Sequence, residues 1–307
     1  MLSVRYGRGK EIDLGLRPTL AARTLFVHVV YQRFTSQIDV REAPRMDLSP
    51  LTRALSLRPA EARLLILTDF DGTLVELAED PDSVELSSSR RDLIRQLARR
   101  PDLSLGVVSG RRLAEVRLKI GAGDGIYYAG LHGLEIEGPG LQFVHSQAAH
   151  TCTLIQRLGR ALVDATRDFA GVRVENKELT VAMHVRRAAP GARQRAEEIF
   201  REITGPSLET GALRLLCGAE VFELLPGVAW TKGDAVLRIR AEVERRHGRS
   251  AWLMYLGDDV TDEDAFSAVG ESGMTIAVGD RPATAAFHLP DPDAVERFLR
   301  QLTLTAP

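Results

Sequence analysis

An apolar run that ends in two aspartates constrains this chain more than any other feature. Residues 64–68 read Leu-Leu-Ile-Leu-Thr, and Asp69-Phe70-Asp71-Gly72-Thr73 follows directly. A short apolar run of this kind is typical of a strand that is buried on both faces of a parallel sheet. The pattern therefore predicts a buried strand that delivers Asp69 and Asp71 into a turn at its carboxyl end, where open parallel sheets bind ligands.

The pairing of the two carboxylates indicates chemistry on a phosphate. One carboxylate would be the nucleophile and the other would transfer protons, with a hard cation between them and the phosphate. An EF-hand calcium loop fails on spacing, because position six would be Leu74 instead of glycine and position twelve would be Asp80 instead of glutamate. A chance acidic turn remains as the alternative, and the five consecutive fitting residues disfavour it.

From Arg63 onward, strand patterns alternate with helix patterns. This order predicts an α/β fold with a Rossmann-like, doubly wound parallel sheet that carries helices on both faces. The expected strands cover 64–68, 103–108, 126–129, 252–256 and 274–278, a hairpin covers 134–136 and 142–144, and the expected helices cover 87–100, 113–120, 232–246, 262–269 and 293–302.

The middle of the chain changes character and predicts an inserted α+β domain, called the cap below. Its expected elements are helices at 153–169 and 192–202 and strands at 172–175, 179–185, 213–216 and 221–225. The predicted organisation is an N-terminal extension at 1–60, a core at 61–145 and 226–307, and the cap at 146–225.

Residues 1–45 are rich in arginine and contain one short apolar run, Thr24 to Tyr31. Arg33 after that run disfavours a secretory signal, and Glu11 and Asp13 disfavour an organellar transit segment. We expect a loosely ordered extension, and Met46 is an alternative start because compact patterning begins shortly after it.

Composition narrows the class of protein. The 307 residues are 44% hydrophobic and 27% charged, which is typical of a globular protein, and 40 Lys and Arg against 42 Asp and Glu give no reason to expect nucleic-acid binding. Cys152 and Cys217 are too few for a disulfide framework, so we expect a reducing, cytoplasmic location. No apolar run approaches the roughly 18 residues of a membrane span.

Three further patches lie at the ends of predicted core elements. Ser109-Gly110-Arg111 follows the second strand and could hold phosphate oxygens, although a simple turn is the usual meaning of such a sequence. Lys232 begins a helix, where an anionic ligand would offset its unfavourable position, but most such lysines are solvated surface residues. Residues 257–263, Gly-Asp-Asp-Val-Thr-Asp-Glu, gather carboxylates that repel one another unless a cation binds. A helix N-terminus alone would explain Asp262 and Glu263 better than Asp258 and Asp259.

Together the four patches are more specific than any one of them. Their order resembles that of the haloacid-dehalogenase-type (HAD) phosphohydrolase superfamily, whose signature is Asp-x-Asp-Gly-Thr. Asp-Phe-Asp-Gly-Thr-Leu, Val-Ser-Gly-Arg, Gly-Leu-His-Gly (130–133) and Gly-Asp-Asp-Val-Thr-Asp-Glu-Asp-Ala-Phe (257–266) are similar to the trehalose-6-phosphate phosphatase family. The resemblance covers residues 63–302, and it implies a HAD core with the inserted cap.

The resemblance implies a role for each core residue. Asp69 would attack phosphorus and form an aspartyl-phosphate, while Asp71 would act as general acid and then general base. Ser109 and Lys232 would neutralise the transferring phosphoryl group. Mg²⁺ would be the cofactor. Its ligands would be Asp69, the backbone carbonyl of Asp71, and an acid of the fourth patch, Asp258 first and Asp259 second.

The same resemblance assigns the sugar side of the site. Arg111, His132 and Gly133 of the core would lie near the sugar, with a turn-stabilising role as the alternative for His132. In the cap, the family's Glu-x-Lys pair matches Glu175 and Lys177. Its Gly-Lys-x-x-x-Glu segment matches residues 218–223, with Glu223 retained but Ala219 in place of the lysine. His184 and Arg186 are candidates for the missing donors, and a solvated hairpin is the alternative for each charged cap residue.

The sequence thus predicts a Mg²⁺-dependent phosphatase that acts on a small-molecule sugar phosphate. The resemblance implies trehalose 6-phosphate as substrate, with a trehalose-6-phosphate synthase as a functionally coupled partner. The alternatives are another glycosyl phosphate, such as sucrose phosphate or glucosylglycerol phosphate, or a non-catalytic sugar-phosphate sensor. The acids Asp69, Asp71 and Asp258 disfavour the sensor, because binding alone needs no acid–base group at position 71.

Overall fold

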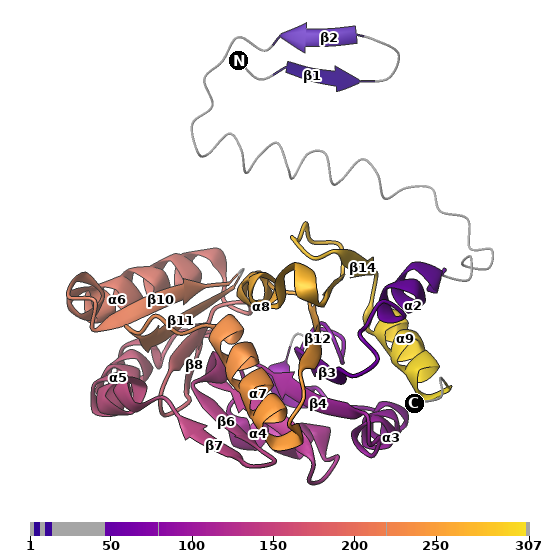
Figure 1. Ribbon diagram of the computed structural model, residues 1–307. Helices are drawn as coiled ribbons and strands as arrows, with labels where there is room; N and C mark the ends of the chain where they lie inside the picture. Colours follow the sequence, from indigo (N-terminus) through magenta and orange to yellow (C-terminus); the bar gives the residue numbers. More distant parts are fainter. Residues whose placement is uncertain (1–2, 7–9, 14–46, 79, 219, 305–307) are drawn as a thin grey trace. The chain divides into compact units, whose positions relative to one another are not determined.

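The computed structural model describes residues 3–6, 10–13, 47–78, 80–218 and 220–304 (Figure 1). The chain divides into two units, Met1–Asp47 and Leu48–Pro307. In the first unit, β1 (Ser3–Tyr6) and β2 (Lys10–Asp13) pair as an antiparallel hairpin. The apolar run from Thr24 to Tyr31 and residue Met46 lie outside the described residues.

The second unit is built on one large sheet. In the described part of the chain this sheet has eight strands in the order β14-β13-β12-β3-β4-β5-β6-β7. The first six are parallel, and β6 and β7 form the expected antiparallel hairpin at one edge. The strands are β3 (Arg63–Thr68), β4 (Leu103–Val108), β5 (Ile126–Gly130), β6 (Glu135–Gly138), β7 (Leu141–Val144), β12 (Ala251–Gly257), β13 (Met274–Val278) and β14 (Phe287–Leu289).

Strand β3 lies at the point where the strand order reverses. The chain proceeds from β3 to β4 and β5 in one direction, and later from β12 to β13 and β14 in the other. All six residues of β3 are buried, as expected for a parallel strand with both faces covered. The carboxyl ends of β3, β4 and β12 therefore meet at the switch point of the sheet, where this class of fold binds ligands.

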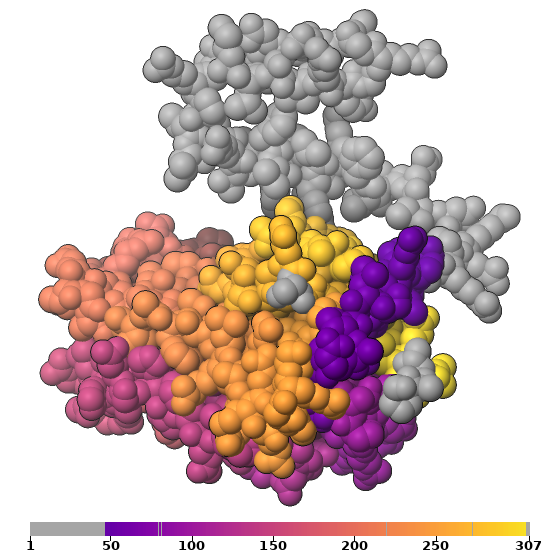
Figure 2. Space-filling model, viewed as in Figure 1, coloured from indigo at the N-terminus to yellow at the C-terminus, as the bar shows by residue number. Residues whose placement is uncertain are grey.

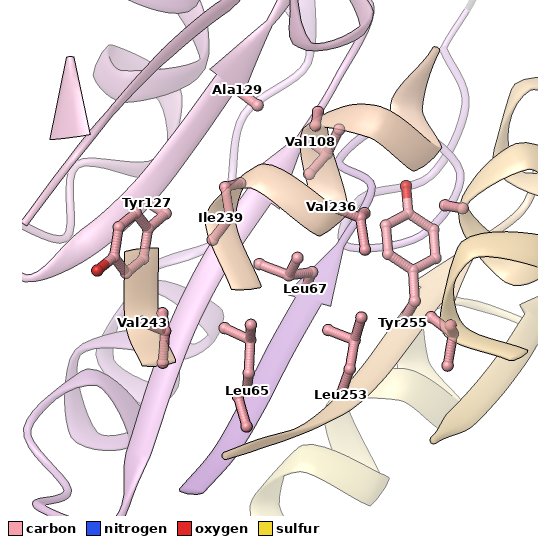
Figure 3. Close-up of a cluster of buried hydrophobic side chains, with 14 of the residues drawn as sticks. Leu65, Leu67, Val108, Tyr127, Ala129, Val236, Ile239, Val243, Leu253 and Tyr255 are labelled. Carbon is pink, nitrogen blue, oxygen red and sulfur yellow. The ribbon is translucent and has the colours of Figure 1, made fainter. Parts of the chain in front are cut away.

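Helices cover both faces of this sheet, so the predicted doubly wound fold is confirmed. On one face, Leu65 and Leu67 of β3 pack against Val236, Ile239 and Val243 of α7 (Figure 3). On the other face, α3 packs on β4 and on α9. The helices of the core are α3 (Ser88–Ala98), α4 (Leu113–Ile120), α7 (Lys232–His247), α8 (Glu263–Val269) and α9 (Pro292–Leu304).

The cap is a four-stranded antiparallel sheet in the order β10-β11-β9-β8, with two long helices packed on it (Figure 1). Side chains on its strands alternate between two faces: Val181 and Met183 point to the cap helices, whereas His184 lies on the opposite face. The elements are α5 (Ser146–Thr166), β8 (Arg173–Asn176), β9 (Val181–His184), α6 (Pro190–Glu209), β10 (Leu213–Cys217) and β11 (Val221–Pro226).

Several bounds differ from the sequence expectation. Helix α6 continues past residue 202, through Gly205 and Pro206, and β14 was not expected. The main unit begins at Leu48, and α2 (Ser49–Leu55) belongs to it because Leu48 and Leu51 are buried, whereas the expected extension ran to residue 60. In the space-filling view α2 lies beside the C-terminal helix α9 (Figure 2).

Four short 3₁₀ turns complete the described part of the chain. They are η1 (Pro81–Ser83), η2 (Leu131–Gly133), η3 (Val260–Asp262) and η4 (Gly270–Ser272). Among the helices that the structure describes, none is both long and apolar enough to cross a membrane.

Candidate active site

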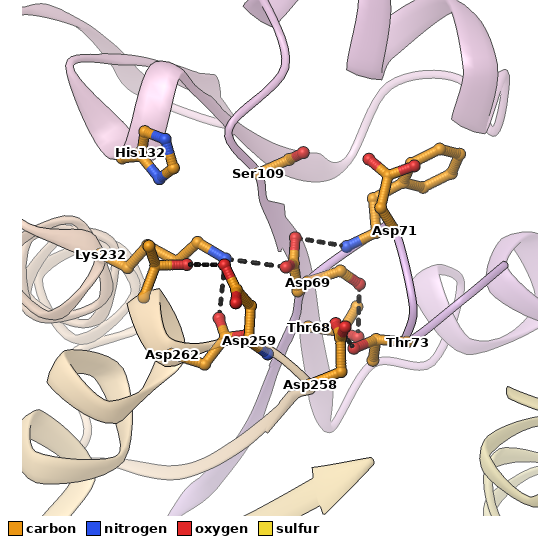
Figure 4. Close-up of polar contacts among 12 residues, drawn as sticks. Thr68, Asp69, Asp71, Thr73, Ser109, His132, Lys232, Asp258, Asp259 and Asp262 are labelled. Carbon is orange, nitrogen blue, oxygen red and sulfur yellow. Dashed lines mark hydrogen bonds and ion pairs between the residues drawn. The ribbon is translucent and has the colours of Figure 1, made fainter. Parts of the chain in front are cut away.

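The four sequence patches come together at the carboxyl ends of the central strands. Asp69 follows β3, Ser109 follows β4, Asp258 follows β12, and Lys232 begins α7. Their side chains converge on one place (Figure 4). The prediction that these residues share a site therefore matches their positions, because parallel strands end at the same edge of the sheet.

Asp69 lies at the centre of this arrangement and is 6% exposed. Its Oδ1 accepts a hydrogen bond from the backbone N–H of Phe70 at 2.6 Å, and its Oδ2 accepts one from Lys232 Nζ at 2.8 Å. Burial raises the pKa of Asp69 well above its usual range, and the nearby carboxylates of Asp262 and Asp258 add to this, although Lys232 opposes it. Asp69 is thus a buried, oriented carboxylate with a cation beside it.

Lys232 is almost completely buried and joins two carboxylates. Its Nζ donates to Asp69 Oδ2 and to Asp262 Oδ1, each at 2.8 Å. Burial alone would lower the pKa of Lys232, but Asp262 and Asp69 outweigh it and hold that pKa well above the usual value. The ammonium group is therefore a permanent positive charge next to Asp69.

Asp262 is fully buried and was missed as a site residue. Its Oδ1 accepts from Lys232 Nζ and from the Tyr255 hydroxyl at 2.7 Å, and its Oδ2 accepts from the backbone N–H of Asp259 at 2.9 Å. One signal in the sequence indicates its role: Asp262 lies three residues after Asp259, which is the spacing of a capping box.

Asp258 faces Asp69 across the turn that follows β3. Its Oδ1 accepts from Thr73 Oγ1 at 2.9 Å. Burial, together with the charge of Asp262, raises the pKa of Asp258 to about 7. Gly72 has a φ of +74°, and a Cβ there would lie 2.0 Å from Asp258 Oδ2, so only glycine lets the two turns approach this closely.

These carboxylates fit a divalent cation. Asp69, Asp258 and Asp262 each offer an oxygen within 4.8 Å of the others, and within the described ranges they face a single ammonium group, that of Lys232. Burial, together with the charge of the neighbouring carboxylates, raises the pKa values of Asp69 and Asp258, and a bound cation would favour their charged forms. Carboxylate oxygens are the ligands that hard divalent cations prefer.

Asp71 is held by Arg111 from the turn after β4. Arg111 Nε lies 2.6 Å from Asp71 Oδ2 and Nη2 lies 2.7 Å from Asp71 Oδ1, and a third N–H group of Arg111 donates to Glu115. The Arg111 guanidinium also lies over the Phe70 ring, 5.5 Å from its centroid. Burial would lower the pKa of Arg111, but Asp71 and Glu115 more than offset this, so Arg111 stays charged.

A pocket with a cavity volume of about 540 Å³ opens between this edge of the core and the cap. The core lines it with Asp69, Asp71, Ser109, Arg111 and His132, among others, and the cap with Glu175, Lys177, His184 and Arg186. This volume suits a small organic ligand. The pocket has carboxylates and a lysine at its core end and mixed charged side chains at its cap end.

Glu223 organises the junction between cap and core. It is buried, and it accepts from Thr180 Oγ1 at 2.8 Å and pairs with Lys177 and His132 at 3.2 Å each. Burial would raise the pKa of Glu223, but Lys177 and His132 hold it well below the usual range. Lys177 Nζ also donates to the carbonyl of Gly110, next to Ser109, so the cap bonds directly to the core turn at this point.

The remaining cap residues pair with acids. His184 Nε2 lies 3.2 Å from Glu175 Oε2. Arg186 Nε donates to Glu220 Oε2 at 2.6 Å, and its Nη1 donates to the carbonyl of Ala78 in the core at 3.2 Å. His184 and Arg186 therefore both line the pocket, and each already contacts a glutamate of the cap.

Asp259, Gly133 and Ala219 are the remaining positions from the sequence analysis. Asp259 is exposed and lines the pocket, but it is not one of the three converging carboxylates; its side chain caps the turn that contains Asp262. Gly133 does not line the pocket; its carbonyl accepts from Trp230 Nε1 at 2.9 Å. Ala219 lies outside the described residues.

Comparison with known proteins points to one family. The family model of trehalose-phosphatases matches residues 67–292. The trehalose-phosphate phosphatase of Mycobacterium bovis is 38% identical over 245 residues, which are 77% of this chain and 60% of that protein, so the chain spans less than two thirds of this relative.

Solved structures agree on the fold. A trehalose-6-phosphate phosphatase related protein has a TM-score of 0.64 and 27% identity, over 78% of this chain and 97% of that one. The C-terminal domain of the C. albicans trehalose-6-phosphate phosphatase has a TM-score of 0.70 and 22% identity, over 87% of this chain and all of that one.

Substitution of Gly72 by alanine tests the close approach of two turns: the turn after β3, which contains Gly72, and the turn after β12, which contains Asp258. Gly72→Ala must displace Asp258, whereas Gly123→Ala, at a φ of +87°, has open space for its Cβ and carries only the backbone cost of about 1–2 kcal/mol. We expect Gly72→Ala to lower the free energy of unfolding by more than Gly123→Ala and to weaken divalent-cation binding, measured by denaturant titration and calorimetry. Equal effects of the two substitutions would show that the approach is not constrained.

Proposed function

Because the chain belongs to the trehalose-phosphatase family, we propose that it hydrolyses trehalose 6-phosphate to trehalose and phosphate through an aspartyl-phosphate on Asp69. The observation that carries this proposal is the placement of Asp69. It is a buried carboxylate at the floor of the pocket, with Lys232 and Ser109 beside it and a second aspartate two residues away.

In the first half of the reaction, a carboxylate oxygen of Asp69 attacks phosphorus. A P–O bond to Asp69 forms and the P–O bond to the sugar breaks, with the electron pair leaving on the sugar oxygen. Lys232 and Ser109 supply positive charge and a hydroxyl donor for the phosphoryl oxygens. Lys232 is already fixed by Asp69 and Asp262, so little reorganisation is needed when the phosphate arrives.

Asp71 transfers the protons. It gives a proton to the departing sugar oxygen and then takes one from the water that attacks phosphorus, after which the P–O bond to Asp69 breaks and phosphate leaves. Both carboxylate oxygens of Asp71 bind Arg111, so this pair must open when substrate enters. Oxygens of the substrate, either anionic phosphate oxygens or neutral sugar hydroxyls, would then accept from Arg111 in place of Asp71.

Mg²⁺ is the proposed cation. Asp69, Asp258 and the backbone carbonyl of Asp71 would hold it. Asp262 accepts three hydrogen bonds, from Lys232, Tyr255 and a backbone N–H, against two at Asp69 and one at Asp258. When bound, Mg²⁺ supplies positive charge that offsets the phosphoryl oxygens and orients the phosphate towards Asp69. Asp262 would then act by holding Lys232 in place.

The cap would recognise the sugar. Glu175, Lys177, His184 and Arg186 line the pocket on the cap side, with Glu223 directly behind Lys177. His132 supports this assignment from the core side, because its Nδ1 is buried and has no hydrogen-bond partner among the described residues. A sugar hydroxyl would satisfy that nitrogen.

Two parts of the proposal concern the cellular setting. The proposed substrate is the product of a trehalose-6-phosphate synthase, and functional coupling to such an enzyme follows from that chemistry. A cytoplasmic location remains a prediction, which the free state of Cys152 and Cys217 supports.

Substitution of the nucleophile separates the enzyme from a non-catalytic sensor. We expect the protein to release phosphate from p-nitrophenyl phosphate with Mg²⁺, and Asp69→Asn to lower that rate at least about a thousandfold, because an amide is not a nucleophile here. Asp92→Asn, on the exposed face of α3, is the control and should keep the rate. A wild-type protein that turns over no phosphate ester would exclude the enzyme.

A panel of sugar phosphates identifies the substrate. Phosphate release is measured with trehalose 6-phosphate, sucrose phosphate, glucosylglycerol phosphate and glucose 6-phosphate. We expect the highest kcat/KM for trehalose 6-phosphate, because the chain belongs to the trehalose-phosphatase family. A higher kcat/KM for another member of the panel would retain the chemistry but replace the substrate.

Substitution of His184 and Arg186 tests whether these two cap residues contact the sugar. With trehalose 6-phosphate, His184→Ala and Arg186→Ala should each raise KM by roughly tenfold, the cost of about one hydrogen bond from a charged or polar donor. Arg201→Ala, on the exposed side of α6, is the control. If KM stays at the wild-type value in both pocket variants, these residues do not contact the sugar.

A further inference from the structure

Arg281 donates hydrogen bonds to the backbone of the acidic turn, residues 257–263, which follows β12. It lies in the loop between β13 and β14, beside the carboxyl end of β12. Its Nε donates to the carbonyl of Asp258 at 3.1 Å, and its Nη2 donates to the carbonyl of Asp259 at 3.0 Å. One guanidinium group thus bonds the backbone carbonyls of two consecutive residues. The first of them, Asp258, is the residue whose carboxylate faces Asp69.

The guanidinium is itself held in place. Its Nη2 donates to Glu263 Oε1 at 2.6 Å, and Glu263 Oε2 accepts from the backbone N–H of Thr284 at 3.1 Å. Arg281 Nη1 donates to the carbonyl of Pro282 at 2.8 Å. The loop 281–284, Arg281 and the first residue of α8 therefore form one hydrogen-bonded unit around the turn.

The position of this turn is critical for Asp258. The carboxylate of Asp258 fits against Gly72 so closely that a single added methyl group would collide with it, and its only hydrogen-bond donor among the described side chains is Thr73. A small rotation of the 258–259 peptide would therefore move the carboxylate away from Asp69. Residues that orient metal ligands in this way affect metal affinity although they do not touch the metal.

We propose that Arg281 is a positioning residue for the divalent-cation site: it fixes the Asp258 and Asp259 carbonyls and thereby aims the Asp258 carboxylate at Asp69. This inference rests on the proposed function for the identity of the cation, Mg²⁺. It assigns to Arg281 no contact with substrate or with the reacting atoms.

The sign of the effect distinguishes positioning from simple electrostatics. Arg281 carries a positive charge near a cation site, so removal of that charge alone would tighten cation binding. Loss of the two carbonyl bonds would weaken it, because Asp258 would no longer be aimed. The two roles of Arg281 therefore predict opposite changes in Mg²⁺ affinity.

The experiment measures Mg²⁺ binding to the substrate-free full chain by calorimetry, with Mn²⁺ binding by electron paramagnetic resonance as a second readout. We expect Arg281→Gln to raise the Kd for Mg²⁺ by about tenfold, the lower end of the effects seen when a supporting residue of a metal site is removed. Arg281→Lys, which keeps the charge but cannot bridge two carbonyls, should also weaken binding.

Arg240→Gln is a matched control. The side chains of Arg240 and Arg281 are both 30% exposed and each pairs with one glutamate, but Arg240 touches no residue of the acidic turns. Tm is measured in metal-free buffer for all variants. A larger Kd for Arg281→Gln at a Tm no lower than that of Arg240→Gln supports positioning; an unchanged or smaller Kd overturns it.

Failure of this inference and failure of the proposed function give different results. Binding of Mg²⁺ is measured without substrate, so a wild-type protein that binds Mg²⁺ but hydrolyses no phosphate ester would refute the function and leave the Arg281 test valid. A protein that hydrolyses trehalose 6-phosphate while Arg281→Gln binds Mg²⁺ normally would keep the function and refute the role of Arg281. A wild-type protein that binds neither Mg²⁺ nor Mn²⁺ refutes the inference.

Discussion

The ion pairs of buried Lys232 are the interaction on which the rest of the site depends. This ammonium group joins Asp69 at the end of β3 to Asp262 in the turn after β12, and it comes from the first turn of α7. Three elements that are far apart in the sequence are thus tied at one point. Removal of one partner from such a buried pair costs about 3–5 kcal/mol, because it leaves a charge in the interior without compensation. Asp69, Lys232 and Asp262 are therefore held against one another by contacts within the protein itself.

Buried ion pairs and hydrogen bonds also join the cap to the core. Lys177, Glu223 and His132 form a buried network whose members come from both parts, and Lys177 also reaches the carbonyl of Gly110. Strand alternation places Glu223 on the face of the cap sheet that points away from the cap helices, because its neighbours Phe222 and Leu224 point to the apolar interior between the sheet and those helices. The cap therefore presents polar side chains to the pocket because its other face supplies its own core.

In the acidic turn after β12, the sequence predicted a cation site but not which carboxylates converge there. The run of acids indicated a cation site, and Asp258 lies where it was expected. Asp259 lines the pocket next to Asp258, but the third converging carboxylate is that of Asp262, which is buried beside Lys232. Side-chain direction in a short turn follows the backbone path and the available donors, and neither is encoded by spacing alone. The role of Arg281 could not be predicted from the sequence either, because its partners are backbone carbonyls at the end of the neighbouring strand β12.

By itself the sequence determined the doubly wound core and the inserted cap, and it identified the candidate site residues Asp69, Asp71, Ser109, Lys232 and Asp258. Periodicity and strand-end motifs are local signals, since a buried strand must be apolar and the residues after it must emerge at the same edge of the sheet. Only the tertiary structure decided which carboxylates face one another, that Arg111 holds Asp71, and that Glu223 joins cap to core. Those contacts depend on which turns lie side by side once the sheet has formed.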